Sequence, residues 1–345
     1  MSEGPNDVVT AAIDAVAAGR DLTVDEAAGV LAEIMSDGVS QVQIAAFLIA
    51  LRTKGETVDE LAGLARTMRA LAIKVDVGER ELLDTAGTGG GVRTFNVSTT
   101  AALIAAGAGC AVAKHGNRSA TGPSGSADLL EALGARIDLD AAGVARCIEQ
   151  TGFGFMFAPA HHRATRSVAP VRQALAVRTI FNFLGPLTNP AGARSQLIGV
   201  SDARYLETIA GALARLGVDR ALVVAGEDSL DEVSISAPTR IVEVNGEEIT
   251  SYTIEPADLG IERHDGVAGA AGGSPEHNAA LTRAVLAGEH GPARDLALAN
   301  AGAAIYAAKA AENLREAVAL AARAVDDGRA AQALERFVAA TNEAA

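Results

Sequence analysis

The stretch LLDTAGTGGGVRTFNVSTT, residues 82–100, decides how the rest of the sequence is interpreted. It begins with a short apolar run typical of a strand end, continues through four glycines, and then opens an Ala-rich helix. The glycines permit a tight turn that brings backbone N–H groups against phosphate oxygens, at a helix start that favours negative charge. The segment therefore predicts a strand, a phosphate-binding loop and a helix, which is the repeating unit of an α/β fold.

Two other interpretations of this loop are open. A dinucleotide site needs the pattern G-x-G-x-x-G, but position 92 is Val, and about twenty residues further on stands Lys114 instead of an acid. A nicotinamide cofactor is therefore disfavoured. An ordinary glycine-rich turn is the default interpretation of such a run taken alone, so the phosphate-binding interpretation needs a second site to support it.

A second anion site follows closely in the sequence. The basic hexamer KHGNRS, residues 114–119, comes after the strand-like run from Cys110 to Ala113, and open α/β sheets bind ligands at the carboxyl ends of their strands. Lys114 offers a point charge to a phosphate, and Asn117 can both donate and accept hydrogen bonds. Thr121 to Ser126 then form a second hydroxyl-rich helix start, suited to a monophosphate. Two such sites predict a ligand with two phosphate groups.

The residues before this region predict short helices. Thr23, Ser40 and Thr57 are each followed three positions later by Glu or Gln, which is the signature of a helix N-terminus, and another helix is predicted over Asp7 to Ala18. The run from Ile44 to Leu51 is apolar nearly all round. That pattern fits a helix at a subunit contact and an ordinary core helix equally well.

From Leu82 onward, short apolar runs alternate with glycine-rich turns and helices, as expected of an α/β domain with a mainly parallel sheet. Residues 274–340 are predicted to be helical, with stops at Gly288 and Gly328. Further strands are predicted over residues 110–114, 154–158, 197–200 and 221–225.

The expected fold class is therefore α/β, with a small all-helical domain and a larger α/β domain whose central sheet is flanked by helices. We expect residues 1–75 to form the helical domain, with a return of residues 163–192 to it. Residues 76–162 and 193–345 are expected to form the larger domain.

Composition excludes several classes of function. The chain has 345 residues, 49% of them hydrophobic, and a formal net charge of -14, which repels polyanions and disfavours nucleic acid as a partner. Cys110 and Cys147 lie in apolar surroundings without CxxC spacing, so we expect buried thiols in a reducing compartment. The long apolar runs carry polar interruptions and the N-terminus is not a secretory signal, so no membrane span is expected and the predicted location is cytoplasmic.

These motifs occur together in one family. Through GTGGG, TFNVSTT, KHGNRS and GSADLLEALG, the sequence resembles the anthranilate phosphoribosyltransferases, of the nucleoside phosphorylase and phosphoribosyltransferase class. The likeness continues in FMFAPA (residues 155–160), RTIFN (178–182), GPLTNP (185–190) and the pair Asp231 and Glu232, so that it covers nearly the whole chain. The resemblance implies transfer of the 5-phosphoribosyl group from phosphoribosyl pyrophosphate to the amine of anthranilate, a step of tryptophan biosynthesis.

The resemblance also assigns substrates and a metal to residues of this chain. It implies two Mg²⁺ ions held with help from Ser98, Asp231 and Glu232, and adjacent acids can ligate hard cations through oxygen. It implies an acceptor site of Gly87, Asn117, Ala158, His162 and Arg172, in which the planar fork of Arg172 suits the carboxylate of anthranilate. The implied donor site consists of Gly87, Gly90, Gly91, Thr94, Asn96, Val97, Ser98, Thr99, Lys114, His115, Gly116, Asn117, Arg118, Ser119, Gly122 and Ser126.

The chemistry of this transfer needs neither a covalent intermediate nor a strong general base, because the arylamine of anthranilate is neutral at about pH 7. His115 is then a hypothesis for orientation or weak proton handling, and a structural loop histidine is an equal alternative. The resemblance further implies a homodimer formed through the N-terminal helical domain.

The sequence departs from the family pattern at a few positions. Gly91 stands where the family has Asp, which would help hold ribose or metal, in a loop one residue shorter. Arg163, Thr165 and Ser229 replace the common Pro, Met and Gly. Alternatives with the same fold are a phosphoribosyltransferase for another aromatic acid and a pyrimidine nucleoside phosphorylase, and a non-catalytic relative that binds nucleic acid is a more remote one. The retained acid pair favours pyrophosphate release over phosphorolysis.

Overall fold

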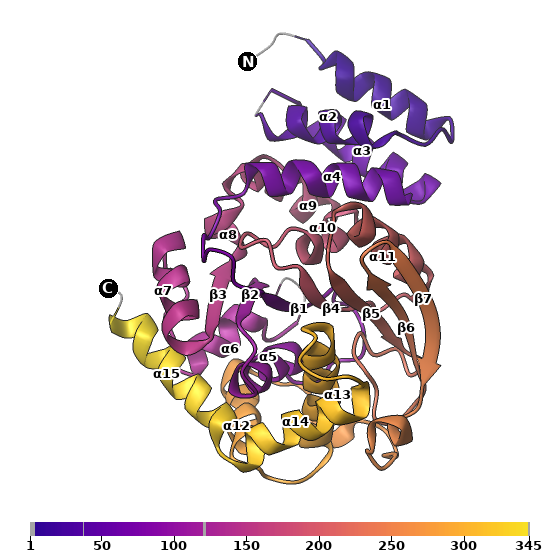
Figure 1. Ribbon diagram of the computed structural model, residues 1–345. Helices are drawn as coiled ribbons and strands as arrows, with labels where there is room; N and C mark the ends of the chain where they lie inside the picture. Colours follow the sequence, from indigo (N-terminus) through magenta and orange to yellow (C-terminus); the bar gives the residue numbers. More distant parts are fainter. Residues whose placement is uncertain (1–3, 37, 120–121, 344–345) are drawn as a thin grey trace.

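The computed structural model describes residues 4–36, 38–119 and 122–343. In that part of the chain the first four helices form a bundle at the top of Figure 1, where α4 packs against the rest of the molecule. They are α1 (Asp7–Ala17), α2 (Val24–Met35), α3 (Gln41–Lys54) and α4 (Val58–Leu71). The larger part of the molecule is built around a central sheet flanked by helices, so the predicted fold class is confirmed.

The predicted helix starts are correct because their signals are local. The Thr23 hydroxyl accepts a hydrogen bond from the Glu26 amide at 3.2 Å, and the Glu26 carboxylate accepts one from the Thr23 amide at 2.8 Å. Thr57 makes the same reciprocal pair at the start of α4. Ser40 caps α3, but the side chain of its partner, Gln43, turns to the backbone of residue 6 at the start of α1 and so ties two helices together.

The sheet places the first strand of the chain near its centre. The strand order is β3 (Phe153–Phe157), β2 (Val112–Gly116), β1 (Leu83–Gly87), β4 (Ser195–Gly199), β5 (Arg220–Gly226), β6 (Thr239–Asn245) and β7 (Glu248–Ile254). The first five strands in this order run parallel. The chain moves outward from β1 to β3 and then returns to the other side of β1 as β4, which makes a topological switch point between β1 and β4.

The hairpin of β6 and β7 was not among the predicted strands, although it carries a signal. Both strands pair antiparallel at the edge of the sheet, and Gly246 in the turn has φ of 62°. Asn245 followed by Gly246 between apolar runs is a strong hairpin pattern.

One face of the sheet is covered by closely packed, alanine-rich helices. Residues 101–105 of α5 (Val97–Gly107) are fully buried, and α5 packs against α13 (Pro292–Ala307) and α15 (Arg329–Glu343). The predicted stops at Gly288 and Gly328 follow α12 (Pro275–Leu286) and α14 (Leu314–Asp326), and both glycines are left-handed. Two more helices, α6 (Ser126–Ala132) and α7 (Ala141–Thr151), complete this layer.

The other face is covered by α11 (Leu206–Arg215) and by the segment that joins β3 to β4. That segment folds as α8 (Ala158–His161), the 3₁₀ turn η1 (Arg163–Ser167), α9 (Ala169–Leu175) and α10 (Phe181–Leu187), and it contacts α3 and α4. Short 3₁₀ turns also lie at η2 (Ala203–Tyr205), η3 (Pro256–Leu259) and η4 (Ala268–Ala270). Among the described helices, none combines the length and apolar character needed to cross a lipid bilayer.

Candidate active site

The glycine loop, residues 87–91, leaves the carboxyl end of β1 at the switch point of the sheet. Gly89 and Gly90 have φ of 65° and 93°, a backbone conformation that residues with a side chain rarely adopt. The loop then passes through residues 92–96 into α5. Ligands of open α/β sheets bind in this position, so the fold puts the predicted diphosphate loop where a ligand is expected.

The start of α5 is not capped by a side chain. Asn96, at the cap position, instead accepts hydrogen bonds from the Ser124 hydroxyl at 3.0 Å and the Asn278 amide group at 2.8 Å. The hydroxyl of Thr99 is buried without a partner, and Val97 is buried beside it. The first turn of α5 therefore has no side-chain cap, and its Val97 and Thr99 amides donate to the Phe95 and Asn96 carbonyls.

Lys114 lies directly beneath the glycine loop. Its side chain is almost fully buried, and Nζ donates to the Thr85 carbonyl at 2.5 Å and lies 3.4 Å from the Ser98 hydroxyl. Burial lowers the pKa of Lys114 to about 8. The structure thus brings together Lys114 of the KHGNRS motif and Ser98 of α5, two residues predicted for the donor site.

Two residues that the sequence did not single out hold this arrangement. Asp84 is buried and accepts hydrogen bonds from the His115 amide at 3.1 Å and the Asn189 side chain at 2.7 Å. Asn189 also donates to the Ala113 carbonyl at 2.8 Å, so the chain before β4 is fastened to both β1 and β2. Burial raises the pKa of Asp84.

The acid pair reaches the glycine loop from the turn after β5. The Thr94 hydroxyl donates to Glu232 Oε1 at 2.8 Å, whereas Oε2 is buried without a hydrogen-bond partner. Burial, followed by the charge of Asp231, raises the pKa of Glu232 well above its ordinary value. Burial also raises the pKa of Asp231, which accepts a hydrogen bond from the Gly89 amide. Two carboxyl groups that burial drives toward neutrality form a site for a cation.

The departures from the family pattern have local physical reasons. A Cβ atom at Gly91 would lie 2.6 Å from Asp231 Oδ1 and 2.8 Å from the Ser229 carbonyl, so this loop admits no side chain at position 91 unless its neighbours shift. Ser229 has φ of 68°, in the left-handed region that favours glycine. The shorter loop and the acid pair therefore pack directly on one another.

The second predicted anion site, at the start of α6, is occupied by the protein's own acid. Asp128 accepts hydrogen bonds from the Gly125 amide at 2.8 Å and the Ser119 amide at 3.1 Å. Arg118 pairs with Asp128 at 2.9 Å and with Glu131, so its guanidinium is already engaged by carboxylates. The Gly122 amide, the Ser126 hydroxyl and the Asn117 side chain complete this loop, in which Gly122 donates to the Ser119 hydroxyl and Ser126 to the Asn117 carbonyl.

Gly116 permits the close approach of this second loop to β2. A Cβ atom there would overlap the Ser126 hydroxyl and lie 2.8 Å from the ring of Phe155. Gly87 is similarly close to the acid pair, since its Cβ would lie 3.0 Å from Asp231 Oδ2. Glycine at the ends of β1 and β2 thus lets the two loops and the acids share one crevice.

Two neutral histidines lie on the other side of this crevice. His115 Nδ1 is 3.2 Å from the Gly185 carbonyl and His162 Nε2 is 3.0 Å from the Thr188 carbonyl, and a carbonyl can only accept, so these nitrogens carry the protons. The rings are 5.0 Å apart. Burial lowers the pKa of His115 to about 3 and that of His162 to about 4. His115 Nε2 is buried and has no hydrogen-bond partner among the residues that the structure describes.

Arg172 lies at the exposed surface of α9, with its guanidinium carbon 5.3 Å from the centre of the Phe181 ring. Its guanidinium forms no hydrogen bond or ion pair with any residue that the structure describes, so its planar fork is available to a carboxylate. Ala158 opens α8 at the carboxyl end of β3. In the part of the chain that the structure describes, Arg172 makes no hydrogen bond or cation–π contact with His115 or His162.

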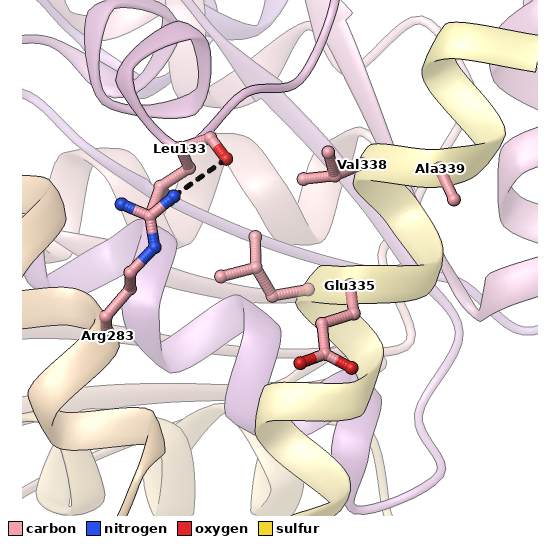
Figure 2. A pocket seen from close by; sticks show the side chains of 6 residues that line it. Leu133, Arg283, Glu335, Val338 and Ala339 are labelled. Carbon is pink, nitrogen blue, oxygen red and sulfur yellow. Dashed lines mark hydrogen bonds between the residues drawn. The ribbon is translucent and has the colours of Figure 1, made fainter.

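Two hollows lie outside the groups described so far. A cavity of about 820 Å³ lies beyond the glycine loop and is lined by Gly90, Arg178, Ser201, Tyr205 and residues 52–56. A smaller one of about 290 Å³, drawn in Figure 2, lies beside α15, where Arg283 donates to the Leu133 carbonyl at 3.1 Å. None of the predicted site residues lines the smaller hollow.

Comparison with known proteins gives a consistent picture. Residues 79–331 match the glycosyl transferase family, a/b domain, and residues 10–72 match the glycosyl transferase family, helical bundle domain. The anthranilate phosphoribosyltransferase of Moorella thermoacetica is 50% identical over 96% of this chain and 98% of that protein.

Solved structures of such enzymes have the same fold. The crystal structure of the enzyme from Thermus thermophilus superposes with a TM-score of 0.91 at 46% identity, over 96% of this chain and 99% of the other. The enzyme from Saccharomyces cerevisiae in complex with PRPP and Mg has a TM-score of 0.88 at 27% identity, over 97% and 98%. Its complex with 4-fluoroanthranilate has a TM-score of 0.87 at 26% identity, over 97% and 98%.

Proposed function

Because this chain belongs to the anthranilate phosphoribosyltransferase family, we propose that it transfers the 5-phosphoribosyl group of phosphoribosyl pyrophosphate to the amine of anthranilate. The products are N-(5-phosphoribosyl)anthranilate and pyrophosphate, and the reaction is a step of tryptophan biosynthesis. The observation that carries the proposal is the glycine loop at the start of α5, which has no side-chain cap, with the buried acids Asp231 and Glu232 packed against that loop.

The chemistry explains what the donor side has to do. As the bond from the anomeric carbon to the diphosphate oxygen breaks, positive charge develops on the ribose and negative charge on the departing diphosphate. The glycine-loop amides, the first turn of α5 and Lys114 are fixed groups that favour this negative charge. Ser126 and Asn117 then receive the 5-phosphate, because Asp128 already occupies the amides of the second loop.

Mg²⁺ fits the acid pair. Glu232 Oε2 is buried and unpartnered, and two adjacent carboxyl groups are held near the hydroxyl of Thr94. Ser98, Asp231 and Glu232 would hold the metal, which when bound supplies positive charge against the leaving diphosphate. The described residues contain no group of three acids, histidines or cysteines able to enclose an ion by themselves. That agrees with the preference of Mg²⁺ for one or two carboxylates plus substrate phosphates, and we propose two ions.

The acceptor side suits a flat, neutral amine with one carboxylate. Arg172 offers its guanidinium fork to that carboxylate, and the neutral rings of His115 and His162 exclude a competing positive charge from the crevice. The unpartnered Nε2 of His115 accepts a hydrogen bond from the amine and so orients its lone pair toward the ribose. Gly87, Asn117 and Ala158 complete the proposed acceptor site.

We further propose the domain division and assembly expected from the sequence. The 163–192 segment contacts the helical domain through α9 on α3 and α10 on α4, which supports its assignment there, although the apolar core that it joins also includes one face of the sheet. Val42 and Ile49 of α3 and Val8 of α1 are exposed apolar side chains on that domain, and they support a homodimer through it. Cys110 and Cys147 are buried and unpaired, as expected of a cytoplasmic protein.

Depletion of anthranilate fluorescence tests the function directly. The protein is mixed with phosphoribosyl pyrophosphate, Mg²⁺ and anthranilate, and fluorescence is expected to fall only when all three are present. A reaction without the donor serves as the control. Absence of turnover across a magnesium series would contradict the assignment.

A further inference from the structure

Arg178 donates two hydrogen bonds to the glycine loop, 89 residues away in the sequence, and a third to Ser201 after β4. Nη1 donates to the Gly89 carbonyl at 2.5 Å and to the Ser201 hydroxyl at 3.0 Å, and Nη2 donates to the Thr88 carbonyl at 3.2 Å. The Ser201 hydroxyl in turn donates to the Gly89 carbonyl at 2.9 Å. A planar guanidinium can hold two carbonyls at once, which the point charge of a lysine cannot do.

These contacts fix the direction of the loop's amide groups. In a trans peptide unit the carbonyl and the following N–H point in opposite directions. Arg178 holds the carbonyls of Thr88 and Gly89, so the N–H groups of Gly89 and Gly90 are turned to the opposite side of the loop. The Gly89 amide indeed meets the carboxylate of Asp231 there, which is an anion on the donor side.

The surroundings of the loop leave this task to few other groups. At Gly90 the loop borders the cavity of about 820 Å³, while its two ends are held by hydrogen bonds from the Thr88 amide to the Gly199 carbonyl and from the Val92 amide to the Ser229 carbonyl. Gly90 leaves the space that the guanidinium occupies, because a Cβ atom at position 90 would overlap Nη1. A loop with two glycines in the left-handed region loses much conformational entropy when it is ordered. Hydrogen bonds from a side chain outside the loop help to offset that loss.

Arg178 belongs to the same chain segment as Arg172 of the proposed acceptor site. Arg178 stands six positions after Arg172, beyond the end of α9, and Ala176 between them has φ of 51°. A left-handed alanine turns the chain sharply out of α9 and brings the next residues over the glycine loop. The segment proposed to clamp the acceptor therefore also supplies the support of the donor loop.

We propose that Arg178 is a positioning residue that sets the glycine loop in its diphosphate-binding conformation. It does not touch the reacting atoms. It acts through the carbonyls of Thr88 and Gly89, whose peptide units turn the Gly89 N–H toward Asp231 and the Gly90 N–H toward the donor. This inference rests on the proposed function for the identity of the ligand, but the contact itself and its effect on the loop do not depend on it.

Steady-state kinetics of Arg178→Ala test the proposal. We expect kcat/KM for phosphoribosyl pyrophosphate to fall about 10- to 100-fold, as for loss of two charge-assisted hydrogen bonds. The KM for anthranilate at saturating donor is expected to change less than about threefold, since no contact in the described part of the chain links the Arg178 side chain to the acceptor residues. Arg178→Lys is expected to restore only part of the loss, because it replaces a fork by a point charge.

The matched control is Arg204→Ala. Arg204 lines the same cavity, but its exposed side chain pairs with Asp202 at 2.7 Å and does not contact the glycine loop as the structure describes it. Its removal is expected to change both kinetic constants less than about twofold. Donor kinetics of Arg178→Ala equal to those of the unchanged protein, or an equal loss with both substrates, would overturn the proposal.

Amide hydrogen exchange separates this inference from the proposed function. Without any ligand, exchange in the peptide covering residues 88–92 is expected to be at least about tenfold faster in Arg178→Ala, while peptides from α13 keep their protection. Unchanged exchange in the loop would overturn the role of Arg178 even in an active enzyme. Conversely, faster loop exchange in a protein without transferase activity would support the role of Arg178 in ordering the loop and would contradict only the proposed function.

Discussion

The two sides of the crevice treat charge in opposite ways. The donor side buries ionisable groups beside one another, with Lys114 against β1 and Glu232 against Asp231, and it leaves atoms such as Glu232 Oε2 unpartnered. The acceptor side holds two uncharged imidazoles, each fixed by a backbone carbonyl. Buried charges are costly without partners, so the donor side is built for ligands that bring opposite charges. The acceptor side keeps its imidazoles uncharged and leaves Arg172 as the group for the single carboxylate of the acceptor.

The largest effect is expected from the acid pair. Asp231→Asn keeps the shape of the side chain but removes the charge that a cation requires, so kcat/KM for phosphoribosyl pyrophosphate at fixed Mg²⁺ is expected to fall about 10²- to 10³-fold. Glu227→Gln, on the same turn but exposed, is the matched control and should change activity less than about twofold. An Asp231→Asn enzyme within about threefold of the unchanged protein would show that the donor side does not depend on its charge.

The acceptor side is tested through Arg172. Arg172→Ala is expected to raise the KM for anthranilate about 10- to 100-fold and that for the donor less than about threefold, because a carboxylate would lose a bidentate partner. Arg166→Ala, a neighbouring exposed arginine in η1, controls for loss of surface charge. Equal effects on both substrates would contradict the assignment of Arg172 to the acceptor side.

The neutrality of the histidines predicts how stability changes with pH. His115 has a folded pKa of about 3 against an ordinary value of 6.5, so below that ordinary value the unfolded chain binds a proton that the folded protein excludes. Stability therefore falls as the pH falls. Between pH 8 and pH 5, this group accounts for a loss of roughly 2 kcal/mol in the free energy of unfolding.

Urea denaturation at pH 8 and pH 5 measures that loss. His115→Gln should remove it, so that the difference between the two pH values shrinks by roughly 2 kcal/mol. His277→Gln, at an exposed position of α12, should leave the difference unchanged. A His115→Gln protein that loses as much stability in acid as the unchanged protein would mean that His115 is charged in the fold.

The smallest effect is expected at the start of α6, where Asp128 already accepts hydrogen bonds from the backbone amides. Asp128→Ala leaves the amides of Gly125 and Ser119 without their acceptor, which should lower the free energy of unfolding by about 1 to 2 kcal/mol. Asp138→Ala, at an exposed acid, should change it by less than about 0.5 kcal/mol. If the two variants were equally stable, Asp128 would not be the cap that closes this anion site.

The parts of the molecule that sequence could predict are those whose causes are local. The capping pairs at Thr23 and Thr57 and the strand before the glycine loop depend on neighbours a few positions away. The basic hexamer was predicted to follow its strand, but Lys114 and His115 lie within β2. The proximity of Lys114 to Ser98 at the start of α5 was predictable from the rule that parallel strands end at one edge of the sheet.

The parts that escaped prediction depend on contacts between distant residues. Asp84 and Asn189 are 105 residues apart, and nothing in either local pattern marks them as partners. Arg178 lies in a motif of the family, but only the fold shows that its guanidinium reaches the glycine loop. The occupation of the second anion site by Asp128 also depended on geometry, although Asp three positions after Gly125 is itself a capping signal.

A crystal structure of the protein with phosphoribosyl pyrophosphate and Mn²⁺ tests the central claim most directly, because anomalous scattering locates the metal independently of the ligand. The diphosphate is expected at the start of α5, against the glycine loop and Lys114, with metal beside Asp231 and Glu232 and with Asp128 still bound to the amides of Gly125 and Ser119. A diphosphate bound at the start of α6, or metal away from the acid pair, would contradict the account.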